Sequence, residues 1–311
     1  MNGVGGYEGW RWIFIIEGIA TLAVGFATFF LLVDLPSAST SWLSSDEVQF
    51  LELQRKFKQG GLNAKGHDVE GGATGFHWRE LKMVLTNWKQ WVLVLALTCQ
   101  AVGVYGVKFH LPTLTKTMGF SSTNAQLLSV PPYILACAAC ILIPRLSDHC
   151  KNRGYFVMGS FATMVVGWIV VTALQGDFSG ARIAPGYIFI CFGVVGNFAT
   201  SPLIIAWGNN NTAPAGRRAM VSAFLNTVCN FGGIVGSFMY LNREAPVYNT
   251  GNGITIAAGV IGCACAVVLH VAWNRANGVN GQRKEVDVRS TYSDDELLRL
   301  GDRSPFFRYM E

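Results

Sequence analysis

Residues 12–33 read WIFIIEGIATLAVGFATFFLLV, a run in which Glu17 is the only charged side chain. A helix of about 20 apolar residues is long enough to cross the hydrocarbon core of a bilayer. Comparable stretches recur along the chain at roughly 90–110, 124–144, 155–174, 185–207, 219–240 and 253–273. The pattern predicts an all-α membrane protein with seven transmembrane helices.

The composition is also typical of a protein that lies in a lipid bilayer. Hydrophobic residues make up 51% of the 311 residues and charged residues 14%, whereas an average soluble domain carries about 25% charged residues. Inside the seven stretches the only fully charged side chains are those of Glu17 and Lys108. The other charges gather in a long polar segment, in short connections and in the tail.

The distribution of Lys and Arg predicts which segments face the cytoplasm. Nineteen of the 24 lie in the tail and in the connections after the first, third and fifth stretches, and only four lie in the other connections. Cytoplasmic segments of membrane proteins carry such an excess. We therefore expect an outside N-terminus and a cytoplasmic C-terminus, with the plasma membrane as the expected location. The basic residues are dispersed and lack an aromatic stacking platform, so nucleic-acid binding is not expected.

The spacing of the stretches divides the chain into one helix plus six. We expect four segments: a first helix in 1–33, a cytoplasmic linker with amphipathic helices in 34–88, a six-helix unit in 89–273 and a cytoplasmic tail in 274–311. In the linker, Ser44 and Glu47 have the spacing of a capping box, which predicts a helix start. A Gly-rich polar stretch at 58–75 and a second amphipathic stretch at 76–88 follow.

The two charges within the apolar stretches are candidate functional residues, because a charged side chain at the centre of a bilayer costs about 2.5–3.5 kcal/mol. Lys108 either extends to the outer interface or faces a water-filled path, where it would attract an anionic substrate. Glu17 either pairs with Arg11 or packs between helices, or it is a proton-coupling carboxylate. Both alternatives stay open for each residue.

Uncharged polar residues form a second set of candidates. They are Gln100, Tyr105, Asn197, Asn226 and Asn230, of which the last two are four residues apart and share a helix face. Such residues either bond neighbouring helices or line a pore. Gly232 and Gly236 have the small-xxx-small spacing of closely packed membrane helices, although glycines can also make a moving helix flexible.

Enzyme chemistry and metal binding find little support in the sequence. No nucleophile–base pair, phosphate loop or metal-spaced cluster is evident, so we predict no catalytic residues, metal site or cofactor. The eight cysteines lie almost entirely within apolar stretches, and Cys137 and Cys140 have no second pair to complete a metal site. We expect them to be unpaired packing residues.

Several motifs resemble the major facilitator superfamily. The connection 145–154 reads RLSDHCKNRG, and its Asp148, Lys151 and Arg153 resemble the acidic and basic residues of that family's cytoplasmic loop motif. The glycine that usually opens the motif is absent, since Pro144 and Arg145 stand there. In that family these charges lock helix ends together on the cytoplasmic side.

Further segments resemble the fungal anion:cation symporter branch, which includes allantoate, nicotinate, pantothenate and biotin permeases. The segments are GWRWIFIIEG at 9–18, WLSSDE at 42–47, LSVPPY at 128–133, GRRA at 216–219, APVY at 245–248 and the tail from Asp302 to Tyr309. Lys108 and His110 depart from the branch, which more often has apolar or small polar residues before Pro112. Because of this departure, the substrate need not be one that members of the branch carry.

The resemblance implies a transporter of twelve helices in two halves. Residues 1–33 would hold the last helix of the first half, and 89–273 would be the C-terminal half of a major facilitator fold. The implied function is transport of a small organic anion, coupled to protons. Because the first five helices would be missing, we expect the chain to be inactive alone.

Two alternatives remain. A seven-helix receptor has the same number of spans and the same expected ends, but the 55-residue segment 34–88 is long for a first cytoplasmic loop. The receptor motifs Asp-Arg-Tyr and Asn-Pro-x-x-Tyr are also absent from the sequence. The other alternative is a half-transporter that pairs with another subunit.

Overall fold

The computed structural model describes residues 4–32, 43–58, 78–174, 180–213, 215–282, 288, 290, 292 and 300–310. Within these ranges the regular secondary structure is helical. Seven helical segments are long and apolar enough to cross a membrane, which confirms the prediction of an all-α membrane protein with seven spans. The chain forms two units, residues 1–62 and 63–311, and each is described by itself.

The first unit contains two α-helices, α1 (Gly9–Leu31) and α2 (Ser45–Lys58). No residue of α1 is buried, so its apolar faces are open to lipid or to other protein. The predicted capping box begins α2: the Ser44 hydroxyl donates to Glu47 Oε2 at 2.9 Å, and the Ser44 N–H donates to the same oxygen at 3.0 Å. These hydrogen bonds hold the pKa of Glu47 below its usual value. Residues 59–75 of the Gly-rich stretch lie outside the described residues.

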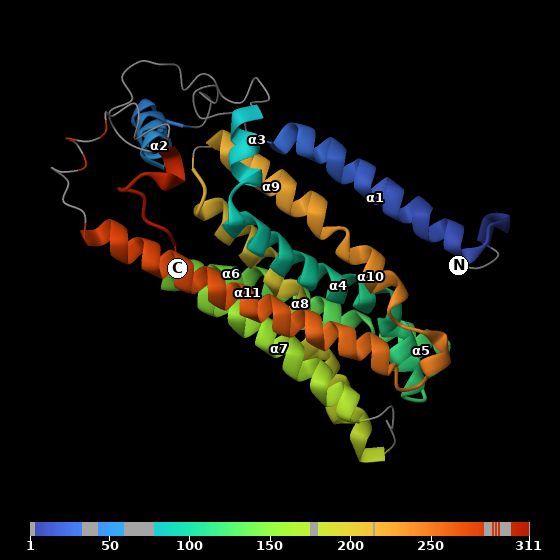
Figure 1. The fold of residues 1–311 in the computed structure, drawn as a ribbon. Helices are drawn as coiled ribbons and strands as arrows, with labels where there is room; N and C mark the ends of the chain where they lie inside the picture. Colours follow the sequence, from blue (N-terminus) through green and yellow to red (C-terminus); the bar gives the residue numbers. More distant parts are fainter. Residues whose placement is uncertain are drawn as a thin grey trace. The chain divides into compact units, whose positions relative to one another are not determined.

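The second unit is a bundle of long helices (Figure 1). Its α-helices are α3 (Trp78–Leu85), α4 (Trp88–Thr117), α5 (Ser122–Leu127), α6 (Val130–Cys150), α7 (Gly154–Ala173), α8 (Ile183–Asn210), α9 (Ala215–Cys229), α10 (Gly232–Phe238) and α11 (Asn249–Gln282). Short 3-10 turns lie at Gly180–Arg182, Asn242–Glu244 and Gly301–Arg303, and a further one lies in the first unit at Val4–Gly6.

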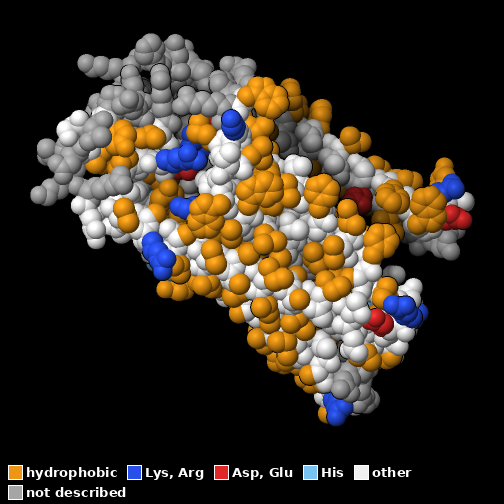
Figure 2. All heavy atoms as spheres, in the orientation of Figure 1, with side chains coloured by type: hydrophobic (Ala, Val, Ile, Leu, Met, Phe, Trp, Pro, Cys, Tyr) orange, Lys and Arg blue, Asp and Glu red, His pale blue; other side chains and the backbone are white. Residues whose placement is uncertain are grey.

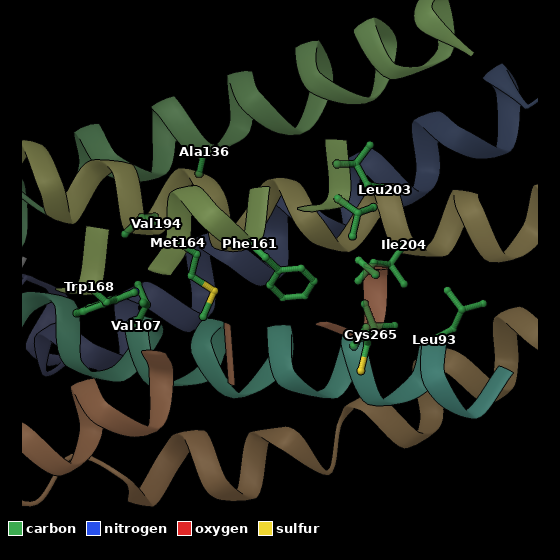
Figure 3. Close-up of a cluster of buried hydrophobic side chains, with 14 of the residues drawn as sticks. Leu93, Val107, Ala136, Phe161, Met164, Trp168, Val194, Leu203, Ile204 and Cys265 are labelled. Carbon is green, nitrogen blue, oxygen red and sulfur yellow. The ribbon is translucent and has the colours of Figure 1, made fainter. Parts of the chain in front are cut away.

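A continuous apolar core joins the helices of this bundle. Figure 3 shows Leu93, Phe161, Met164, Trp168 and Leu203 directed into one interior from helices far apart in sequence. Trp168, Phe161 and Leu203 are essentially inaccessible to solvent. Because lipid is as apolar as these side chains, the core holds the helices together mainly by close packing.

Glycines permit the closest helix contacts. A Cβ on Gly232 would lie 2.6 Å from the Thr98 carbonyl oxygen, and one on Gly236 would lie 2.6 Å from the Val102 carbonyl oxygen. The small-xxx-small pair therefore packs α10 directly against α4, which confirms the packing interpretation for these two glycines.

Two predicted spans are interrupted in the structure. The stretch 124–144 is divided into α5 and α6, which begins at Val130, just before two prolines that lack a backbone N–H for the preceding turn. The stretch 219–240 is divided into α9 and α10 by a turn at Asn230 and Phe231. Hydropathy could not locate either break, because both lie within apolar sequence.

The surface agrees with a membrane environment. Figure 2 shows hydrophobic side chains over most of the middle of the visible face, whereas Lys and Arg appear mainly toward its ends. Exposed apolar residues include Leu95, Ile134, Leu142, Val166 and Val260. Such a surface is stable against hydrocarbon and would be an aggregation hazard in water.

Candidate functional site

A polar stripe on α4, on α9 and in the turn after α9 brings together four of the predicted residues. The Tyr105 hydroxyl donates to Asn230 Oδ1 at 2.9 Å, although the two residues are 125 positions apart. Asn230 Nδ2 donates to the Asn226 carbonyl at 2.5 Å, and Asn226 Nδ2 donates to the Ser222 carbonyl at 2.8 Å. We call Tyr105, Lys108, Asn226 and Asn230 the polar stripe.

Lys108 lies beside this arrangement. Its Nζ is 5.7 Å from the centre of the Tyr105 ring, within the range of a cation–π contact. Helix α4 continues to Thr117, so Lys108 lies about 13 Å along the helix axis from its last residue, at 1.5 Å per residue. The predicted stretch ends at residue 110, which would put Lys108 two residues from the end of its helix. Because the helix is longer, the exposed Lys108 lies well inside it.

The polar stripe has a physical consequence for its surroundings. Asn226, Asn230 and Lys108 are exposed, and Asn226 lies near the middle of the apolar segment Gly216–Phe238. Polar groups and charges that face hydrocarbon are costly, so in membrane proteins they face protein or a water-filled cavity. This face of α4 and α9 is therefore suited to line an interior path.

Gln100 and Asn197 form a separate, buried pair. Gln100 Nε2 donates to the Asn197 carbonyl at 3.1 Å and joins α4 to α8. The Asn197 side chain is fully buried against Gly103, and neither its Oδ1 nor its Nδ2 has a hydrogen-bond partner among the described residues. The structure thus places these two candidates inside the bundle, away from the bonds that join the polar stripe.

The predicted loop motif lies where α6 meets α7. Arg153 Nη2 forms an ion pair with Asp148 Oδ1, and the Arg153 side chain is 6% exposed. Lys151 is exposed and ends α6 in a left-handed conformation, with its N–H donating to the Asp148 carbonyl at 3.2 Å. Asp148 and Arg153 thus connect the two helix ends, whereas Lys151 shapes the turn.

Glu17 lies on α1, in the other unit. Its side chain is exposed, and its carbonyl accepts a hydrogen bond from the Thr21 hydroxyl at 2.8 Å. The Arg11 guanidinium lies 5.3 Å from the centre of the Trp10 ring, and no ion pair joins Arg11 to Glu17 in the described part of the chain.

Sequence reasoning missed a charged cluster at the end of the bundle where α4 begins, which we call the tail-side end. Arg217 bonds Glu80 Oε2 at 2.8 Å and forms an ion pair with Asp302 Oδ1, and its side chain is only 4% exposed. Burial raises the pKa of Asp302, and the nearby Arg217 charge opposes this shift. The partners are far apart in sequence, so their spacing offered no signal.

A second missed cluster surrounds His110. Its ring stacks on the Tyr240 ring, with ring centres 4.2 Å apart, and packs edge-on against the Tyr248 ring, with ring centres 4.1 Å apart. Its Nε2 has no hydrogen-bond partner among the described residues. All eight cysteines are free, and the described residues contain no group of metal-ligating side chains.

These features define an integral membrane protein. The chain belongs to the Major Facilitator Superfamily, whose profile matches residues 2–237.

Curated relatives agree with this assignment. The chain is 27% identical to an MFS-type transporter, cnsO, of Penicillium expansum, over 100% of this chain and 60% of the relative. It is 26% identical to the high-affinity nicotinic acid transporter of Saccharomyces cerevisiae, over 98% of this chain and 54% of the relative. An uncharacterized transporter of Schizosaccharomyces pombe, C1002.16c, is 30% identical over 87% of this chain and 50% of its own length. The chain thus spans about half the length of these relatives.

Proposed function

We propose that this chain is part of a membrane transporter for a small organic anion, coupled to protons, and that the polar stripe contributes to the substrate path. The observation that carries this proposal is the bonded pair Tyr105–Asn230 beside the exposed ammonium of Lys108. Together these groups offer hydrogen bonds and a positive charge to a carboxylate. The nicotinic acid transporter among the relatives supports this substrate class.

The organisation of the transporter is also part of the proposal. We place the last helix of one half in 1–33, a linker in 34–88, a six-helix half in 89–273 and a tail in 274–311. Transporter substrates bind near the midplane between two repeats. A chain with about half the length of its relatives would then need further helices to complete the site. We place the protein in the plasma membrane with its tail in the cytoplasm.

Vesicle uptake tests the role of Lys108. The chain is fused behind the portion of the nicotinic acid transporter that the alignment leaves uncovered. Replacing Lys108 with Ala should reduce uptake of labelled nicotinate, allantoate or pantothenate about tenfold, because a charge-assisted hydrogen bond contributes about 1.5–3 kcal/mol. Lys108→Arg should retain most uptake, and Lys116→Ala, a cation at the end of the same helix, is the matched control. Equal uptake by Lys108→Ala and the control would refute the role of Lys108, and uptake by the unfused chain would refute the expected inactivity.

The same assay tests proton coupling. Glu17→Gln keeps the size of the side chain but cannot bind a proton, so uptake should lose its dependence on external pH. Glu8→Gln, at an exposed carboxylate just before α1, is the control. A pH profile that is unchanged in Glu17→Gln would assign the coupling to another group.

A further inference from the structure

We propose that the tail-side end of the bundle carries a peptide-binding site whose ligand is the chain's own segment 300–310, held there as a detachable strap. This segment contacts residues of α4, α8, α9 and α11, which are far apart in sequence. The proposal concerns binding within this chain and does not depend on the transported substrate.

Two asparagines bind the backbone of the strap. Asn277 Nδ2 donates to the Tyr309 carbonyl at 2.9 Å, and its Oδ1 accepts from the Tyr309 N–H at 2.9 Å. Asn211 Nδ2 donates to the Met310 carbonyl at 3.0 Å, and its Oδ1 accepts from the Met310 N–H at 2.7 Å. Trp207 Nε1 donates to the Met310 carbonyl at 3.0 Å. Paired bonds of this kind recognise an extended backbone, as a neighbouring strand does.

Side chains of the strap supply the remaining contacts. The Tyr309 ring stacks near Trp273 with ring centres 6.4 Å apart, and Lys89 Nζ lies 4.4 Å from the centre of the same ring. The Tyr309 hydroxyl donates to the Asp302 carbonyl at 2.6 Å, which folds the strap back on itself. The site therefore accepts an aromatic residue as well as a peptide backbone.

The Asp302 carboxylate completes the attachment through its ion pair with Arg217. Arg217 lies in the first turn of α9, and the same helix carries Asn226 nearer its other end, with Asn230 in the turn that follows it. While it is bound, the strap fixes the start of the helix that presents two residues of the polar stripe. Its release would free that helix end.

The strap combines hydrogen bonds and the Asp302–Arg217 ion pair with one apolar contact, the Tyr309 ring against the core, and part of it stays exposed. Phe306 is 44% exposed and Arg308 is exposed, so the segment buries only part of its apolar surface. Hydrogen bonds of this kind contribute about 0.5–1.5 kcal/mol each, because water can replace either partner. Segments with few buried apolar contacts open at lower free energy than the core does.

Amide hydrogen exchange on the complete 311-residue chain in lipid nanodiscs tests the proposal. The amides of Tyr309 and Met310 should be protected, and Asn277→Ala should speed their exchange about tenfold, since two hydrogen bonds are lost. Asn124→Ala, an exposed asparagine in α5, is the matched control and should change nothing there. An excess of synthetic peptide LGDRSPFFRYME, the sequence of residues 300–311, should displace the strap and speed exchange of the same amides.

Peptide competition needs no substitution, so it tests the proposal even if Asn277→Ala does not fold. A peptide with Tyr309 and Met310 both replaced by alanine keeps the backbone hydrogen bonds but loses the ring contacts with Trp273 and Lys89, so it should compete more weakly than the native peptide. Exchange that stays slow at saturating native peptide would show that the segment is a fixed part of the fold. Exchange that is fast without any addition would show that the site does not hold the segment. Either result would overturn the proposal.

Discussion

Gly196→Ala is expected to lower the free energy of unfolding by about 3 kcal/mol, the upper part of the usual range for an overpacked interior. The added methyl group would lie 2.5 Å from the Met164 backbone nitrogen and 2.6 Å from the Ser160 carbonyl oxygen. Both atoms belong to the backbone of α7, so no side-chain rotation relieves the clash. Helices α7 and α8 must therefore separate, which loosens the core around Met164. Unfolding in mixed detergent micelles would measure the loss.

Gly159→Ala is the matched control for this substitution. It lies in α7 and a methyl group there meets nothing within 4 Å. The same chemical change should therefore leave stability unchanged or raise it slightly, because alanine favours the helix. Equal stability of the Gly196 and Gly159 variants would show that α7 and α8 do not pack as closely as described.

Arg217→Ala is expected to cost about 3–5 kcal/mol, because it removes the positive partner of a buried charge cluster. Asp302 is 6% exposed and Glu80 is 23% exposed, so water compensates their charges poorly. Arg218→Ala is the neighbouring control. It also removes an arginine, but Arg218 donates to an uncharged acceptor, the Thr212 carbonyl, at 3.3 Å. Thermal unfolding of both variants at neutral pH should separate them clearly.

The pH dependence of Arg217→Ala provides a second measurement. Burial already raises the pKa of Asp302 above its usual value of 3.8, and loss of the Arg217 charge should raise it further. The folded variant then binds this proton more tightly than the unfolded chain does. Its stability should therefore increase as the pH falls from neutral toward the raised pKa. A defect that is the same at every pH would argue against an unpaired Asp302 charge.

Hydropathy predicted the spans well because a membrane helix needs a long apolar run, and that requirement is local in sequence. The capping box at Ser44 and the small-xxx-small pair at Gly232 were also predictable, since their residues lie within one or two helical turns. The breaks at residues 128–129 and 230–231 were not, because the single polar residue in each, Ser129 or Asn230, leaves the surrounding sequence apolar.

The sequence by itself determined that the chain crosses a membrane, where its spans lie and which polar residues within them need an explanation. The tertiary structure decided how those residues group: Tyr105 with Asn230 and Lys108, but Gln100 with Asn197 inside the bundle. It also decided that Arg217 meets Asp302 and that Asn277 binds the tail. Partners of this kind come from helices that meet only when the core packs, so their distance along the chain conceals them.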